Sequence, residues 1–297
     1  MNSLLLWIVA SGGSVLVPRL ASTVIVLRDT SGCPEVFMVR RHEGTAFMAG
    51  AHVFPGGAID PADHDADESW CDGMAHATTQ LAELPVDEAV AHHVAAAREL
   101  FEEAGVLLAR DAGGGFVSLA GRETHARFAD YRHELHRGQQ RFRSILERER
   151  LRLAIDSLIH FAHWVTPPVD TRRFDTRFFV TRVPPQQTPA HDDRETTEST
   201  WLSAAAAIAG ARANAIVLPP PTWATLREIE PFTSVDDALA WARQRRVVRR
   251  EPVILDHGGR HLLVMPGDPF HPEPAHEESR LSETRFVRVA GCWVAEA

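Results

Sequence analysis

The chain has 297 residues, of which 44% are hydrophobic, and it carries a formal net charge of −9 with a pI near 6.0. This length fits one α/β domain with insertions, and the apolar content is ample for a core. The acidic balance argues against a protein that binds duplex nucleic acid, because such a protein needs a basic surface to neutralise phosphates.

Cysteines and the N-terminal stretch bear on the cellular compartment. Cys33, Cys71 and Cys292 are widely spaced and odd in number, so they indicate neither a disulfide framework nor a zinc site. We therefore expect a reducing cytoplasm. The apolar stretch 4–17 is interrupted and too short to span a bilayer, so we expect no membrane partner. Residues 1–20 are treated as an extension without assigned order, for which a misplaced start codon is at least as good an explanation as a signal.

Short runs of β-forming residues predict strands at 22–27, 35–39 and 52–54, and a further one at 106–108. The third run leads into Gly56 and Gly57, where the backbone can turn sharply and approach a ligand closely. Between the third and fourth runs we expect a helix that starts after Pro85 and ends at Gly105, which suits the left-handed residue beyond a helix end.

Three carboxylates lie on one side of this helix. Glu99, Glu102 and Glu103 are spaced i, i+3 and i+4, while the apolar side chains gather on the opposite side. We call these three residues the acidic ridge. Crowded carboxylates on an anchored helix favour a hard divalent cation, Mg²⁺ or Mn²⁺, over the alternative of a solvated surface. His92 and His93 precede the ridge without a third ligand, so we expect them to face solvent.

Together, the glycine pair and the ridge resemble the Nudix signature G-x5-E-x7-R-E-U-x-E-E-x-G-U, in which U is a bulky apolar residue. Residues 98–106 match every fixed position, but 40 residues separate Gly57 from Arg98. The surplus, at about 60–85, is interpreted as a surface insertion. The first Glu of the signature, counted back from Arg98, falls on Val90, and the resemblance implies that this position is mainly structural.

A long insertion at this point is similar to the branch of the Nudix family that contains coenzyme A diphosphatases. The resemblance continues through 163–168, 172–179 and 218–222 and covers about 21–241. It implies an α/β/α sandwich with a mixed sheet, an insertion within the motif and a C-terminal extension. We accordingly predict a Nudix domain over 21–245 and a β-rich appendage over 246–297.

The remaining elements follow from composition and turn signals. Residues 125–153 predict one or two exposed helices, broken near Gly138, with Arg141 and Arg143 in surface ion pairs. Further along the chain we expect strands at 174–183, 196–202, 253–255 and 262–265, helices at 203–209, 219–230 and 235–245, and a turn-rich linker or lid at 267–272.

The resemblance implies roles for the ridge and its surroundings. Glu99, Glu102 and Glu103 would hold the metal together with a backbone carbonyl of the glycine turn, and Glu103 is the best candidate for an essential residue. We expect Arg98 to pair with Glu102 one turn along the helix. Several relatives take a further carboxylate from a remote loop. Our candidate is Glu198, with an ordinary exposed strand residue as an equal alternative.

Phosphate groups of the substrate require cationic partners, which Arg provides better than Lys. We expect Arg41, Arg172 and Arg173 to contact substrate. Arg40 is the weaker candidate, because neighbouring strand residues face opposite ways. An upstream motif of coenzyme A-cleaving relatives has a second Arg where this chain has Ala46.

The leading hypothesis is metal-dependent cleavage of coenzyme A or acyl-coenzyme A to 3′,5′-ADP and the corresponding 4′-phosphopantetheine. The alternatives are a broader pyrophosphatase for dinucleotides or nucleotide sugars, acting on NADH or ADP-ribose, and a non-catalytic nucleotide-binding regulator. The intact acidic ridge argues against the regulator, because a binder has no evident need for three mutually repelling carboxylates. Under each of these three hypotheses, the partner is a small molecule that contains a nucleoside diphosphate. The oligomeric state is left open.

Overall fold

The computed structural model describes residues 16–44, 48–192, 196–275 and 281–296. Its centre is a mixed sheet in the order β10-β2-β1-β9-β8-β11, with β3 added to β2 and β4 to β1. The strands β1 and β9 are parallel, as are β8 and β11, and the others pair antiparallel. The bounds are β1 (Arg19–Arg28), β2 (Glu35–Arg41), β3 (His52–Val53), β4 (Gly56–Ala58), β8 (Ile159–Val165), β9 (Phe174–Arg182), β10 (Thr196–Ser203) and β11 (Arg249–Arg250).

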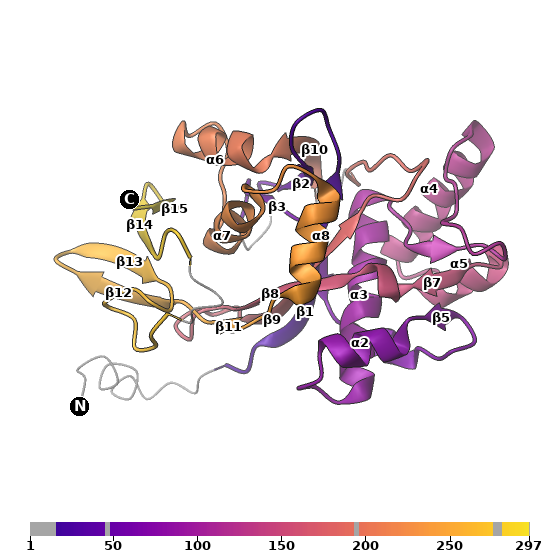
Figure 1. Ribbon diagram of the computed structural model, residues 1–297, viewed down its shortest axis with the longest axis horizontal. Coiled ribbons are helices and arrows are strands. Elements are labelled where there is room, and N and C mark those ends of the chain that lie inside the picture. The colour runs from indigo at the N-terminus through magenta and orange to yellow at the C-terminus, as the bar shows by residue number, and fades with distance from the viewer. Residues whose placement is uncertain (1–15, 45–47, 193–195, 276–280, 297) are drawn as a thin grey trace.

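One face of this sheet is covered by the ridge helix and by short elements outside it (Figure 1). The ridge helix begins and ends as predicted, after Pro85 and before Gly105, whose φ of 65° is left-handed. Around it lie η1 (Pro61–Asp65), β5 (Cys71–Asp72), α2 (Met74–Gln80), α3 (Val86–Ala104), β6 (Ala109–Arg110), α4 (Arg122–His136), α5 (Phe142–Glu149), β7 (Arg152–Ala154) and η2 (Ile155–Ser157), of which α3 is the ridge helix.

The other face carries α6 (Ala204–Arg212), α7 (Pro220–Ile229) and α8 (Val235–Gln244). The Ser234 hydroxyl accepts the N–H of Asp237 at 3.1 Å, which caps α8. Alternating strand residues divide between two cores, since Val24 and Val26 pack on the α3 side and Ile25 and Leu27 on the α7 side. These layers form the predicted α/β/α sandwich.

The last strands, β12 (Val253–His257), β13 (Arg260–Val264), β14 (Arg285–Val289) and β15 (Cys292–Ala295), form a separate antiparallel sheet. It packs on α7, where the rings of Trp223 and Phe286 lie 6.4 Å apart. By contrast, β11 joins the central sheet beside β8. The β-rich character of the C-terminal region is confirmed, and its division from the rest at residue 245 stays a prediction.

Two local expectations were wrong. The segment at 60–85 is not confined to the surface: Trp70, Cys71 and Leu81 are at most 4% exposed, because they fill the core outside α3. Residues 106–108 form no strand. Instead, the amide of Gln187 accepts the Leu107 N–H at 2.9 Å and donates to its carbonyl at 3.0 Å. A side chain thus takes the place of a neighbouring strand.

The region at 125–153 does form two helices, α4 and α5, separated around Gly138. Arg143 pairs with Asp67 at 3.2 Å and with Glu147 at 2.7 Å, as expected of an ion-paired surface. The helices are not exposed all round, however. The rings of Phe128 and Phe142 contact Phe101 of α3, so this pair of helices covers the apolar side of the ridge helix.

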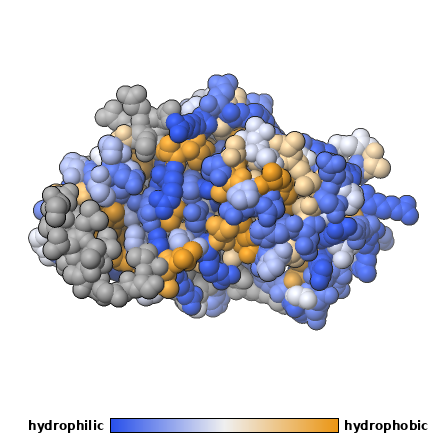
Figure 2. Space-filling model, turned by 90° about the horizontal axis from the view of Figure 1, so that it is seen from below, coloured by the Kyte–Doolittle hydropathy of each residue, from blue (hydrophilic) through white to orange (hydrophobic). Residues whose placement is uncertain are grey.

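The surface gives few further signals. Cys33, Cys71 and Cys292 are free thiols, and the cytoplasmic location stays a prediction. Seen from below, the molecule is largely hydrophilic, with apolar residues gathered across the middle of this face (Figure 2). Within the described part of the chain, no helix is long and apolar enough to cross a membrane. Most of the apolar N-terminal stretch lies outside the described residues.

Candidate active site

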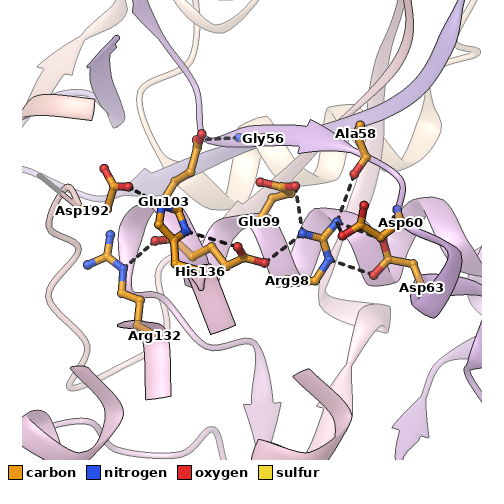
Figure 3. Close-up of polar contacts among 11 residues, drawn as sticks. Gly56, Ala58, Asp60, Asp63, Arg98, Glu99, Glu103, Arg132, His136 and Asp192 are labelled. Carbon is orange, nitrogen blue, oxygen red and sulfur yellow. Dashed lines mark hydrogen bonds and ion pairs between the residues drawn. The ribbon is translucent and has the colours of Figure 1, made fainter. Parts of the chain in front are cut away.

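The acidic ridge and the glycine pair meet at strand β4 (Figure 3). The Gly56 N–H donates to Glu103 Oε2 at 2.9 Å. A Cβ atom at Gly57 would lie 2.5 Å from Glu99 Oε1, so only glycine leaves room for this carboxylate. Two ridge carboxylates therefore approach the backbone of the glycine turn, the closeness that the family resemblance implies.

Arg98 holds the ridge together from the side. Its Nη1 donates to Oε1 of Glu99 and to Oε1 of Glu102, both at 2.9 Å. The predicted pairing of Arg98 with Glu102 is confirmed. Burial disfavours the guanidinium charge, but the hydrogen bonds to Asp63 and the adjacent carboxylates raise the pKa of Arg98, so it stays charged.

Asp63 is the second anchor of Arg98. The guanidinium donates through Nε and Nη2 to the two Asp63 oxygens, each at 2.9 Å, and Asp63 is 2% exposed. Burial raises the pKa of Asp63 above its ordinary value, although the hydrogen bonds from Arg98 oppose this shift.

The position of Asp63 corrects the assignment of the motif's first acid to Val90. Val90 is 3% exposed and packs in the core. Counted forward from Gly57, the first Glu of the signature falls on Asp63, a shorter carboxylate. The extra residues therefore follow this acid. Counting from the glycine as well as from Arg98 would have found it.

No motif or spacing in the sequence pointed to a chain of contacts beyond Glu102. His136 of α4 lies with Nδ1 3.3 Å from Glu102 Oε2 and with Nε2 2.9 Å from Asp192 Oδ2 (Figure 3). Arg132 donates through Nε to the Glu102 carbonyl at 2.6 Å and through Nη2 to the Ala190 carbonyl at 3.0 Å. These contacts tie α4 and the loop at 190–192 to the C-terminal end of α3.

Glu198 is not brought to the ridge. It is exposed and stands opposite Arg40 in the pairing of β10 with β2. By strand alternation, both residues share the face of Met38, which packs on the α7 side, whereas α3 covers the other face. The loop carboxylate that approaches the ridge is Asp192, reached through His136.

The predicted substrate arginines separate in the structure. Arg41 lies on the face of β2 that α3 covers, and its buried Nε has no hydrogen-bond partner among the described residues. Arg40 faces the other way, as expected, and it pairs with Glu43 at 2.6 Å. Arg172 is exposed.

Arg173 has a different role from the one predicted. It is 7% exposed and donates to Glu251 at 2.5 Å and to the Thr166 carbonyl at 3.1 Å. A buried guanidinium committed to a carboxylate and a carbonyl is a structural anchor. Arg173 thus holds the segment that leads to the C-terminal sheet.

His92 and His93 do not face solvent, because α3 is packed on both sides. Both are fully buried. His92 Nδ1 is hydrogen bonded to Ser22 Oγ at 3.1 Å, and the His93 ring lies 4.4 Å from that of Phe179. Burial lowers the pKa of each imidazole to about 3, so both are neutral near pH 7.

The donor set at the ridge suits a hard cation. Carboxylate oxygens and the backbone of a glycine turn are ligands that Mg²⁺ and Mn²⁺ accept. Within the described residues, no three side chains of His, Cys, Asp or Glu are already gathered for one ion. Glu102 is engaged by Arg98 and His136, whereas Glu103 is engaged by Gly56.

Known structures define the class of protein. A crystal structure of a NUDIX hydrolase from Alicyclobacillus acidocaldarius superposes with a TM-score of 0.63 and 26% sequence identity, covering 76% of this chain and 97% of that one. The fold and the ridge are thus those of a Nudix hydrolase, an enzyme that acts on diphosphate bonds. Nudix hydrolases generally use divalent metal ions.

The sequence family is more specific. The family model of the NUDT19 Nudix domain matches residues 73–229, more than half of the chain, so the chain belongs to this family. The human acyl-coenzyme A diphosphatase NUDT19 is 29% identical over 84% of this chain and 75% of its own length. The protein of the same name from Xenopus laevis is 24% identical over 80% of this chain and 72% of its own length.

Proposed function

We propose that the protein hydrolyses the diphosphate of coenzyme A or acyl-coenzyme A, releasing 3′,5′-ADP and the corresponding 4′-phosphopantetheine. The convergence of Glu99 and Glu103 on the Gly56–Gly57 turn carries this proposal, because it gives oxygen ligands for Mg²⁺ or Mn²⁺ beside a backbone that a diphosphate can approach. The names of the human and Xenopus laevis relatives support the choice of substrate.

In the proposed reaction, water attacks one phosphorus in line, and the bond to the bridging oxygen breaks. The ridge would hold a divalent cation, which would neutralise the diphosphate charge and polarise the phosphorus. Glu99, Glu102 and Glu103 are the proposed ligands, and Glu103 is the proposed essential carboxylate. Arg98 orients Glu99 and Glu102 through one nitrogen. Arg41, whose Nε has no hydrogen-bond partner within the described part of the chain, is the proposed contact for a phosphate of the substrate.

The test is to incubate the purified protein with Mg²⁺ and, separately, with coenzyme A, NADH and ADP-ribose, and to identify the products by mass. We expect release of 3′,5′-ADP from coenzyme A, and we expect Glu103→Gln to abolish it. Turnover unaffected by Glu103→Gln would disprove the assignment of the ridge.

A broader diphosphatase is the second candidate, because Arg173 is committed to Glu251 and so leaves fewer cations for a 3′-phosphate. Ala46, the departure from the upstream motif, lies outside the described residues. Comparison of coenzyme A with 3′-dephospho-coenzyme A separates the two candidates. Equal kcat/KM for both substrates would favour the broader enzyme, and absence of any cleavage would favour a nucleotide-binding regulator.

A further inference from the structure

A cavity of about 750 Å³ adjoins the ridge. Its walls are η1, α3, the C-terminal end of α4, α5 and the turn that joins α4 to α5. Arg98, Glu102 and His136 line it, so it is continuous with the candidate active site. The volume falls within the range of ordinary small-molecule sites.

Charge limits what this cavity can hold. Five carboxylates line it, those of Asp60, Asp63, Asp65, Glu102 and Glu147, against three guanidinium groups, those of Arg98, Arg141 and Arg143. Arg98 is already bound to Asp63, Glu99 and Glu102, and Arg143 to Asp67 and Glu147. The excess of negative charge in this lining would repel a phosphate-bearing group, whereas it would not repel a neutral group.

The remaining lining suits a neutral chain that contains amides. Trp70, Val94, Leu135 and Phe142 contribute apolar surface. Gln140 lines the same space, and its buried Nε2 has no hydrogen-bond partner among the described residues. A buried amide donor without an acceptor is costly, and a carbonyl of a bound ligand would satisfy it.

We propose that this cavity binds the neutral pantetheine arm of the substrate, while the phosphorylated 3′,5′-ADP half lies outside it. This inference rests on the proposed function, since it assumes that the substrate has such an arm. The pantetheine arm combines methylene and methyl groups with two amides, which match the apolar walls and the unpaired donor of Gln140.

Two variants and two matched controls test the cavity. Ser144 is exposed and lines it, so Ser144→Trp narrows the space from its rim. Gln140→Leu removes the unpaired donor at similar size. The neighbouring Gln139 is exposed and does not line the cavity, so Gln139→Trp and Gln139→Leu introduce the same side chains beside it.

We expect Ser144→Trp to raise KM for coenzyme A about tenfold and to lower kcat far less, because it removes binding of a part remote from the reacting phosphorus. The inhibition constant of 4′-phosphopantetheine should rise in parallel, and that of 3′,5′-ADP should not. Gln140→Leu should act in the same direction and more weakly. Both Gln139 variants should behave as wild type.

If the cavity variants instead raise the inhibition constant of 3′,5′-ADP, the nucleotide half of the substrate lies in the cavity. If Ser144→Trp and Gln140→Leu both keep the wild-type KM and inhibition constants, no part of the substrate lies there. Either result overturns the inference. Calorimetry with pantetheine alone tests the cavity assignment separately from the proposed function. If wild-type protein binds pantetheine and Ser144→Trp does not, the cavity assignment stands even without hydrolysis of coenzyme A. Hydrolysis of coenzyme A without any response to these variants supports the proposed function and refutes the cavity assignment.

Discussion

At the scale of single residues, Arg98 joins the two halves of the motif, which the inserted segment separates in the sequence. Its side chain is 8% exposed and contacts carboxylates on both sides, Asp63 on one and Glu99 with Glu102 on the other. A buried charge needs such partners, because desolvation costs several kcal/mol when they are missing. The stability of this region and the geometry of the ridge therefore depend on the same guanidinium.

Asp63→Asn removes the charge that compensates Arg98. We expect the free energy of unfolding to fall by about 3 kcal/mol, because the buried Arg98 loses its bidentate carboxylate and keeps only Glu99 and Glu102 to compensate its charge. Turnover should fall as well, since Arg98 is then free to shift toward the ridge. Urea unfolding and steady-state kinetics measure both effects. Asp65→Asn, at an exposed position of the same short helix, should change stability by less than about 0.5 kcal/mol. Equal stability of the two variants would contradict this account.

Gly57 tests the close approach of backbone and ridge. In Gly57→Ala, the new Cβ atom would lie 2.5 Å from Glu99 Oε1, so this carboxylate must move. We expect kcat/KM to fall by at least about tenfold, as is common when a reacting constellation is misplaced by an ångström. Gly32→Ala is the control, because nothing lies within 4 Å of a Cβ atom there. Full activity of Gly57→Ala would show that Glu99 is not needed in its present place.

At the scale of elements, residues near a helix end predicted where that helix begins and ends, because the local backbone decides both points. The ridge helix starts after Pro85 and ends before Gly105, because a fixed φ and a left-handed glycine set those ends. The burial of His92 and His93 could not be predicted this way. It depends on the packing of α3 against β1 and β9, which supply Ser22 and Phe179, and periodicity within one helix does not report which elements pack on it.

In the candidate site, too, contacts within one helix could be predicted from the sequence, whereas contacts between distant segments could not. The spacing of residues 98–106 located the ridge, and the expected contact of Arg98 with Glu102 is present at 2.9 Å. The contacts of His136 and Asp192 join segments far apart in the chain, so spacing carried no information about them. Glu198 was chosen from its place in the sequence alone, and the pairing of β10 with β2 turns it toward the other face of the sheet.

Arg132 tests the link between α4 and α3. It donates to the carbonyls of Glu102 and Ala190, which are oxygens near the end of α3 and in the neighbouring loop. We expect Arg132→Ala to lower the free energy of unfolding by about 1–3 kcal/mol and to increase hydrogen exchange in the loop at 187–192. Arg137→Ala, at an exposed position of the same region, is the control. Unchanged exchange in that loop would count against the link.

At the scale of the whole molecule, the interior of the α3 face holds four histidines. His92, His93, His160 and His163 are all less than 9% exposed, and burial is the largest cause that lowers the pKa of each. Neutral imidazoles are stable in this core, whereas imidazolium ions are not. The fold is therefore sensitive to acid through residues that lie outside the ridge.

The direction of this sensitivity follows from the two pKa values. In the unfolded chain a histidine titrates near 6.5, whereas burial lowers the pKa of His93 to about 3 in the folded state. Between these values the unfolded state binds more protons, so stability is fully present above about pH 6.5 and falls as the pH decreases. Each fully shifted histidine contributes up to about 1.4 kcal/mol per pH unit in this window.

Urea unfolding at pH 7, 6 and 5 should therefore show a steep loss of the free energy of unfolding. His93→Phe should reduce this loss by one histidine's share, because a neutral ring packs on Phe179 without titrating. His125→Phe, at an exposed position of α4, should leave the slope unchanged. If His93→Phe and wild type lose stability at the same rate, His93 is already protonated or solvated in the folded protein, and its burial is not what makes the molecule sensitive to acid.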